Sequence, residues 1–302
     1  MTYSIVARDP DTGEMGVACQ SQAFAVGSSV PWAVPGYGVI ATQSMGEPMY
    51  GELGLDALRA GLTAPEALKA LRSVDPYPER RQVAMVDGRG NLAVYTGTQC
   101  VAQAGHQVGE GCAAQANMAA SDTVWPAMVA AYEQTSGVLA RRLMAALHAA
   151  EDEGGDFRGR RSASIAVVRE DRSGRPWHDE IVDLRVDDST DPVGELDRMV
   201  AHSERYHRMV TAFEAAVDGD PREGMEQLEQ LEPVEVAREP DLCAWKAVVL
   251  ALDGRGAQAR EVLDQLAGTA PQFVEVVRRL DAVGLLGDSA TLDGLLPPVA
   301  RS

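Results

Sequence analysis

The residue whose type and position most clearly allow catalysis is Thr2, which follows Met1. Methionine aminopeptidase normally removes Met1 when the next residue is small, and removal leaves Thr2 with a free α-amine. Such a threonine carries a nucleophilic hydroxyl and a base on one residue. The reference pKa of an α-amine is about 7.7–8.0, so part of it is neutral near pH 7. The pattern predicts an N-terminal nucleophile, although Met-Thr is also an ordinary way for a cytoplasmic protein to begin.

Three amide side chains, Gln20, Gln43 and Asn117, stand inside otherwise apolar segments that are typical of strands. A buried amide needs hydrogen-bond partners, so each is either a bridge between elements or part of a site. Ser21 and Cys19, in the first of these segments, are alternative nucleophiles.

Charged candidates are few. Arg160 has the planar fork that holds a carboxylate with two hydrogen bonds, but beside Arg158 and Arg161 it is also typical of a surface cluster. His202 and His207 are five residues apart, which puts them poorly on one helix face. We therefore expect no metal site and no cofactor.

The overall charge restricts the partners. The 302 residues include 27 Lys and Arg against 45 Asp and Glu, a formal net charge of −18. Such a surface repels phosphate backbones and anionic lipids, so we expect neither nucleic-acid nor membrane binding. The chain shows no signal-peptide pattern and no apolar span, and its four cysteines form no C-x-x-C pair. We expect a cytoplasmic protein with a small-molecule substrate.

The first part of the chain alternates strand patterns with pairs of helix patterns. Helices that come in adjacent pairs disfavour a doubly wound parallel sheet. Two antiparallel sheets face to face, with helix pairs outside, satisfy the order. The predicted strands are 3–8, 15–21, 39–43, 82–87, 91–96, 111–117, 162–168 and 180–186, and the predicted helices are 51–61, one from residue 63, 124–134 and 138–151.

The character of the chain changes in the acidic stretch 187–192. Beyond it, amphipathic helix patterns at 196–216, 221–231, 242–252, 257–266 and 273–283 indicate an all-α tail. Helical pairs of this spacing favour tetratricopeptide-like packing. We therefore predict a mixed α+β domain over 1–192 and a helical domain over 193–302.

Several motifs resemble one family. They include Thr2–Pro10, Gln20-Ser21, Val26–Trp32, Ala41–Ser44, Arg81–Ala84, Gln115–Met118, Arg158–Arg160 and Asp183–Val186. Over about residues 2–190 the sequence resembles the DUF1028 family, which is similar to N-terminal-nucleophile (Ntn) hydrolases. The resemblance implies a four-layer αββα sandwich, a helical tail of the kind found on many members, and a homo-oligomer.

The resemblance also implies site positions. In proteasome-type subunits, the threonine works with an Asp near the end of the second strand and a Lys after it. Here Gln20 falls near the Asp position, and 29–33 contains no lysine. The turn at Ser44 to Gly46 falls where such folds supply an oxyanion-hole amide.

Two main hypotheses follow. The first is an Ntn amidohydrolase that cleaves an amide-like C–N bond of a small polar substrate, with Thr2 as nucleophile after removal of Met1. The second, favoured by the missing Asp/Lys pair, is a binding or scaffold protein without catalysis, whose helical tail recruits a partner protein. Attack by Ser21 or Cys19 is a third possibility.

Overall fold

The computed structural model describes residues 2–232, 236–286 and 294–297, except the side chains of Pro176 and Trp177. The chain divides into two compact units, Met1–Val200 and Ala201–Ser302. The division falls inside helix α6 (Pro192–Val217) because the start of this helix buries Val193 and Leu196 in the core of the first unit. Each unit is described by itself below.

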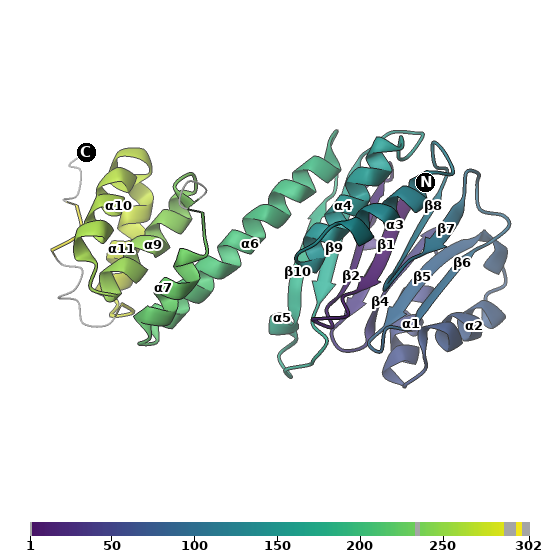
Figure 1. Cartoon of the computed structure of the whole chain (residues 1–302), viewed down its shortest axis with the longest axis horizontal. Helices are drawn as coiled ribbons and strands as arrows, with labels where there is room; N and C mark the ends of the chain where they lie inside the picture. The colour runs from purple at the N-terminus through teal and green to yellow at the C-terminus, as the bar shows by residue number, and fades with distance from the viewer. Residues whose placement is uncertain (1, 233–235, 287–293, 298–302) are drawn as a thin grey trace. The chain divides into compact units, whose positions relative to one another are not determined.

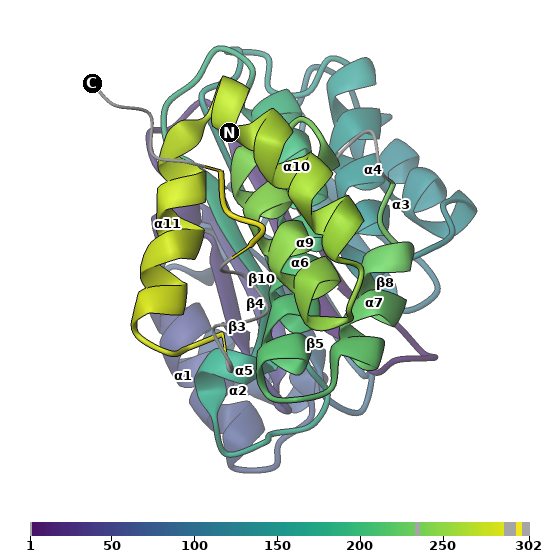
Figure 2. The ribbon, with the colours of Figure 1, turned by 90° about the vertical axis from the view of Figure 1, so that its left-hand side faces the viewer.

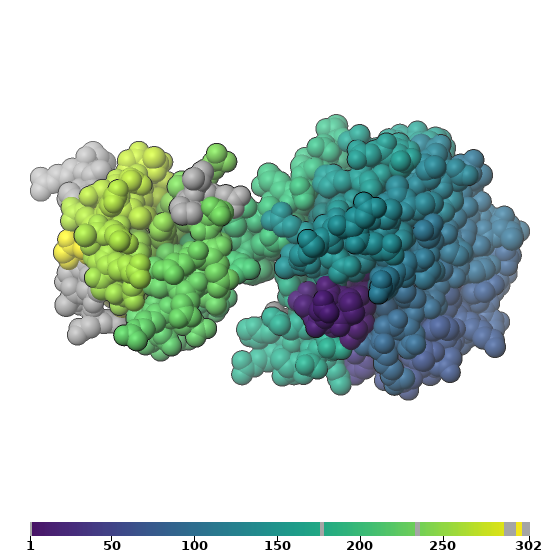
Figure 3. All heavy atoms as spheres, in the orientation of Figure 1, coloured from purple at the N-terminus to yellow at the C-terminus, as the bar shows by residue number. Residues whose placement is uncertain are grey.

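The first unit contains a six-stranded antiparallel sheet with the order β10-β9-β2-β1-β8-β7 (Figure 1). Strand β1 lies inside this sheet, paired with β2 on one side and β8 on the other. The turn between β1 and β2 reaches the surface, as the purple spheres in Figure 3 show. The strands are β1 (Thr2–Arg8), β2 (Met15–Ser21), β7 (Gly105–Val108), β8 (Cys112–Asn117), β9 (Ser162–Val168) and β10 (Glu180–Val186).

A second antiparallel sheet has four strands in the order β3-β4-β5-β6. Its register pairs Gln43 of β4 with Gln82 of β5, and Gln82 in turn with Thr96 of β6. The strands are β3 (Pro31–Val34), β4 (Gly38–Ser44), β5 (Arg81–Asp87) and β6 (Leu92–Thr96).

Two helix pairs cover the sheets on opposite sides (Figure 1). Helices α3 (Val124–Gln134) and α4 (Leu139–Asp152) pack on the six-stranded sheet, and α1 (Met49–Arg59) and α2 (Ala64–Val74) pack on the four-stranded one. Thr63 and Glu66 form the capping box that the sequence predicts at the start of α2, which satisfies backbone N–H groups there.

Strand alternation divides the buried residues of β1 between two cores. Tyr3 and Ile5 pack under α3 and α4, whereas Val6 packs in the core between the two sheets. Each sheet thus has a helix pair on one face and the other sheet on its opposite face.

The second unit is helical and has its own hydrophobic core. Figure 2 shows α9, α10 and α11 beside one another in this unit. Leu242, Val248 and Leu263 are buried in this core, in agreement with the apolar faces of the predicted helices. Among the described residues, the helices α7 (Pro221–Glu229), α9 (Pro240–Leu252), α10 (Gly256–Thr269) and α11 (Pro271–Ala282) follow α6.

The prediction of a mixed α+β region with two antiparallel sheets, followed by a helical region, is confirmed. The sequence analysis missed β3 and β7, and also the short helix α5 (Pro176–Asp179). Both strands are short edge strands of four residues without a fully buried side chain, so neither shows a clear apolar alternation.

Candidate functional site

Thr2 is held in the middle of the six-stranded sheet, at one end. It pairs with Ser21 of β2 and with Asn117 of β8, and it is 8% exposed. Residues directly opposite on neighbouring strands project from the same face, so these three side chains share one face. Two residues further on, Ser4 donates a hydrogen bond to Oε1 of Gln43 in the other sheet (2.7 Å), which identifies this face as the one between the sheets.

Three predicted site residues contact Thr2 directly. Its hydroxyl donates a hydrogen bond to Oγ of Ser21 at 3.2 Å. Its carbonyl oxygen accepts one from Nε2 of Gln43 at 2.9 Å and a longer one from Nδ2 of Asn117 at 3.4 Å. All three side chains are neutral, so hydroxyl and amide dipoles surround the hydroxyl and carbonyl of Thr2.

A buried amide network lies behind these contacts and has Gln82 at its centre. Its Oε1 accepts hydrogen bonds from Gln43 (2.8 Å) and Asn117 (3.0 Å). Nε2 of Gln115 donates to Oγ of Ser4 at 3.2 Å. We call Ser4, Gln43, Gln82, Gln115 and Asn117 the amide network; each is at most 2% exposed.

Gln82 also connects the two sheets. Its Nε2 donates to the carbonyl oxygens of Ala116 (2.8 Å) and Gly105 (3.1 Å) in the six-stranded sheet. It donates as well to Oγ1 of Thr96 at 2.9 Å in its own sheet. Gln82 and Gln115 are not among the residues that the sequence predicts for the site, although each is an amide inside an apolar strand, like Gln43 and Asn117.

The structure does not bring Gln20 and Arg160 to this face. Gln20 pairs with Tyr3, so it points toward the helices α3 and α4, and within the described chain neither of its side-chain polar atoms has a hydrogen-bond partner. Arg160 is half exposed and pairs with Glu151 (Nε–Oε2 2.9 Å) and Asp191 (Nη1–Oδ1 3.5 Å). Glu151 also accepts a hydrogen bond from the Tyr3 hydroxyl.

The turn at Ser44 to Gly46 directly follows Gln43, so it lies at the same end of the sheets as Thr2. Ser44 has φ 75°, a left-handed conformation that costs a residue with a side chain about 1–3 kcal/mol and is concentrated at functional sites. A Cβ added at Gly46 would meet nothing within 4 Å, so this turn borders open space.

Cys19 is a poor candidate for a nucleophile at neutral pH. It is fully buried, and its Sγ lies 3.4 Å from Oγ of Ser164. Burial raises the pKa of the Cys19 thiol to about 12, so it stays protonated. Ser21, in contrast, is in contact with Thr2.

Within 2–232, 236–286 and 294–297, no three His, Cys, Asp or Glu side chains are grouped so that they could hold a metal ion. Over the same part of the chain, none of the helices combines the length and apolar character needed to cross a membrane.

Comparison with known proteins identifies the family of this chain. Residues 2–196 match a protein family described as a family of unknown function, DUF1028. The chain belongs to the DUF1028 family. The match includes Thr2 and the whole amide network, and it ends shortly after α6 begins. No curated protein matches this DUF1028 chain significantly.

A solved structure resembles this DUF1028 protein. It is the crystal structure of protein SPO2555 from Silicibacter pomeroyi, also assigned to DUF1028. The two sequences are 31% identical, and the structures superpose with a TM-score of 0.60 over 67% of this chain and 88% of that one.

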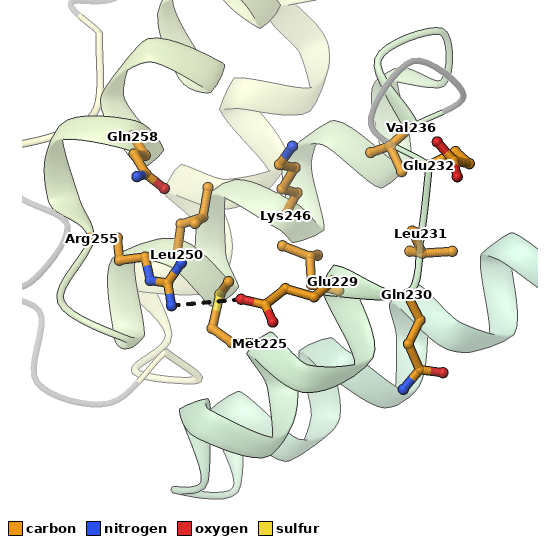
Figure 4. Close-up of a pocket in the computed structure, with 11 residues that line it drawn as sticks. Met225, Glu229, Gln230, Leu231, Glu232, Val236, Lys246, Leu250, Arg255 and Gln258 are labelled. Atoms are coloured by element: carbon orange, nitrogen blue, oxygen red, sulfur yellow. Dashed lines mark ion pairs between the residues drawn. The ribbon is translucent and has the colours of Figure 1, made fainter.

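The second unit of the DUF1028 protein contains a separate cavity of about 340 Å³ (Figure 4). Lys246 and the pair Arg255–Glu229 (3.9 Å) contribute charge to its wall. Apolar side chains supply much of the remaining lining, among them Met225, Leu228, Leu231, Val236 and Leu250.

Proposed function

We propose that this protein is an N-terminal-nucleophile amidohydrolase that cleaves an amide-like C–N bond, with Thr2 as the nucleophile after removal of Met1. The observation that carries the proposal is the support given to Thr2. Its hydroxyl contacts Ser21, and its carbonyl is held by Gln43 and Asn117 of a buried network. Met1 lies outside the described residues, so its removal stays a prediction.

In the proposed reaction, Oγ1 of Thr2 attacks the substrate carbonyl carbon and forms a C–O bond. The α-amine of Thr2 takes the hydroxyl proton, directly or through a water molecule. The C–N bond then breaks, and the protonated amine passes its proton to the leaving nitrogen. Water hydrolyses the resulting ester, which releases the acid and restores the Thr2 hydroxyl.

Charge that develops on the substrate oxygen needs hydrogen-bond donors in fixed positions. Within the turn from Ser44 to Gly46 we assign this role to the backbone N–H of Gly46, because the N–H of Met45 donates to the carbonyl of Arg80. Nδ2 of Asn117 holds the Thr2 carbonyl and Gln82 instead. The strained φ of Ser44 and the open space beside Gly46 support this assignment.

The neutral surroundings of Thr2 also fit this chemistry. An adjacent carboxylate would favour the protonated α-amine and make it a weaker base, whereas the side chains that contact Thr2 are neutral hydroxyl and amide groups. The α-amine thus replaces the Asp/Lys pair of proteasome-type enzymes. The two face-to-face sheets with outer helix pairs support the αββα layering proposed with this function.

A β-lactone probe tests the proposal, because such an electrophile acylates an activated threonine hydroxyl. We expect an N-terminal peptide that lacks Met1 and carries the adduct on Thr2. Thr2→Val keeps a small residue that permits Met1 removal but has no hydroxyl, so labelling should cease, and Thr2→Ser should restore it. Wild-type protein that has lost Met1 and yet stays unlabelled would contradict the proposal.

A second candidate is a binding protein whose helical tail recruits a partner, and the cavity of Figure 4 favours it. Its size lies within the range of ordinary ligand sites. In this case, Leu250→Glu should remove a specific partner from the proteins that co-purify with the full chain, while Thr2→Val leaves that partner bound. The reverse pattern, with activity lost only in Thr2→Val, favours the hydrolase.

A further inference from the structure

Several loops are joined by hydrogen bonds around the end of the sandwich that contains Thr2. The N–H of Gln22 donates to Oδ2 of Asp156 at 3.0 Å. The N–H of Phe157 donates to the carbonyl of Met118 at 3.4 Å, and the N–H of Met118 donates to the carbonyl of Val101 at 2.9 Å. These bonds link the loops after β2, β8 and β6 with the loop before β9.

The chain of contacts continues into the four-stranded sheet. Sγ of Cys100 donates to the carbonyl of Arg81 at 3.3 Å, and the Arg81 guanidinium donates to the carbonyl of Met45 at 2.6 Å. The loop after β4 is thereby included. We call the segments 22–25, 45–48, 97–104, 118–123 and 155–161 the loop ring.

Large apolar side chains are exposed on the loop ring. Phe24 is 64% exposed, Phe157 61%, Met45 60% and Val101 49%. They come from four different segments of the ring. Phe24 and Phe157 are also the only phenylalanines among residues 1–200, so the first unit exposes both of its phenylalanines at this end.

Exposed apolar side chains also occur elsewhere on the chain, but four of them lie on loops that surround the end of the sandwich with Thr2. Burial of a phenylalanine side chain stabilises a protein, and the first unit leaves both of its phenylalanines exposed. Single exposed apolar residues are ordinary, but several gathered around a polar site mark a binding surface. The segment that carries Phe157 is also well anchored, because the buried Asp156 accepts hydrogen bonds from the N–H groups of Gln22 and Arg158.

We propose that the loop ring is the substrate-recognition surface and that it selects amides whose acyl part carries an apolar group, such as an alkyl chain or an aromatic ring. This inference rests on the proposed function, because Thr2 must be the reacting group. It replaces the small polar substrate expected from the sequence. The scissile carbonyl would lie at Thr2, and the apolar group would cover the side chains of Phe24 and Phe157.

Two β-lactone probes with arms of equal length test the inference, one bearing a hexyl arm and the other an ether arm. The measurement is the rate constant for acylation of Thr2 in the full chain. Removal of two or three methylene groups from water, at about 0.8 kcal/mol each, predicts labelling about tenfold or more faster for the hexyl probe. Equal rates would overturn the inference and leave the proposed function intact.

Substitutions of Phe24 and Phe157 test whether these side chains cause the preference for the hexyl probe. Phe24→Ser and Phe157→Ser should each lower the hexyl-to-ether ratio severalfold, and Phe157→Leu should retain most of it. Val138→Ser is the matched control, because Val138 is 51% exposed and precedes Leu139, which packs at the opposite end of the sheet beside Gly16. A ratio that the two phenylalanine variants leave unchanged would overturn the inference. No labelling by either probe would overturn the proposed function as well.

Discussion

The two faces of β1 have polar systems of opposite kinds. Toward the other sheet, Thr2 contacts the amide network, which includes Ser4 and in which every side chain is neutral. Toward the helices, Tyr3 donates to Glu151, which in turn pairs with Arg160. Successive residues of one strand therefore support a neutral system on one side and a charged system on the other.

The difference follows from access to water. A buried charge carries a large desolvation penalty, whereas a buried amide needs only its hydrogen bonds. The amide network is inside the sandwich, and its amides form hydrogen bonds there, except for Oε1 of Gln115, which has no partner in the described chain. Arg160 is 48% exposed, so its charge stays hydrated. Stability at the neutral face therefore depends on hydrogen bonding between neutral groups, and at the charged face on pH and salt.

The largest expected effect is at the centre of the neutral face. Gln82→Leu removes the acceptor of Gln43 and Asn117 and leaves buried carbonyl groups without donors. Each unsatisfied buried group costs about 1–3 kcal/mol, so we expect a loss of about 3 kcal/mol in the free energy of unfolding, measured with urea. The exposed Gln107→Leu should change it by less than about 0.5 kcal/mol. Equal effects would contradict the role given to the network.

The charged face should respond to alkaline pH. Burial, together with the charge of Glu151, raises the pKa of Tyr3 well above its usual value. The unfolded chain ionises this tyrosine near pH 10 but the folded chain does not. The stabilisation is therefore complete below pH 10 and is lost as pH rises toward the folded pKa, by up to about 1.4 kcal/mol per pH unit.

Tyr3→Phe tests this dependence. The wild-type free energy of unfolding should fall more steeply between pH 9.5 and 11 than that of the variant. Other tyrosines are present in both proteins, so the difference between the two slopes reports Tyr3 alone. Parallel slopes would show that Tyr3 titrates alike in the folded and unfolded states.

A substitution of Gln20 should raise the free energy of unfolding, whereas the substitution of Gln82 lowers it. Gln20 is fully buried on the helix-facing side, and neither side-chain polar atom has a partner in the described chain. Gln20→Met keeps a similar length and removes the unsatisfied amide, so the free energy of unfolding should rise by about 1 kcal/mol. A loss of stability in thermal or urea unfolding would mean that ordered water satisfies Gln20.

The smallest effect is expected at the exposed end of the charged face. Arg160→Gln should cost about 0.5 kcal/mol or less, because half-exposed ion pairs are weak. The cost should disappear in 1 M NaCl, where charges are screened over a few ångströms. The loss in Gln82→Leu should persist in the same salt. A salt-sensitive loss in Gln82→Leu would remove the distinction between the two faces.

Much of the site could be predicted from residue type alone. Thr2, Ser21, Gln43 and Asn117 are polar residues in apolar strands, and the structure brings them together. Gln20 gives the same signal but lies on the other face, because strand alternation separates it from Ser21. Which face is turned to the other sheet depends on the packing of strands that are far apart in sequence.

The elements of the fold could likewise be predicted only where the local sequence carries a pattern. Helices α3 and α4 were predicted nearly to the residue, because their periodic leucines, alanines and methionines must be buried. Strands β3 and β7 depend on pairing with β4 and β8 and carry little pattern of their own. The partnership of Gln82 with Asn117 joins two sheets, and no local signal encodes it.

The inside position of β1 has a consequence for the order of synthesis. Its pairing with β2 needs only the next few residues, but Thr2 meets Asn117 across 115 intervening steps of the chain. At about 5–20 residues per second, a ribosome takes roughly 6–23 s to make that stretch. During this interval one edge of β1 has no neighbour and the shell around Thr2 is incomplete. Thr2 reaches its final surroundings only after the segment through β8 has left the ribosome.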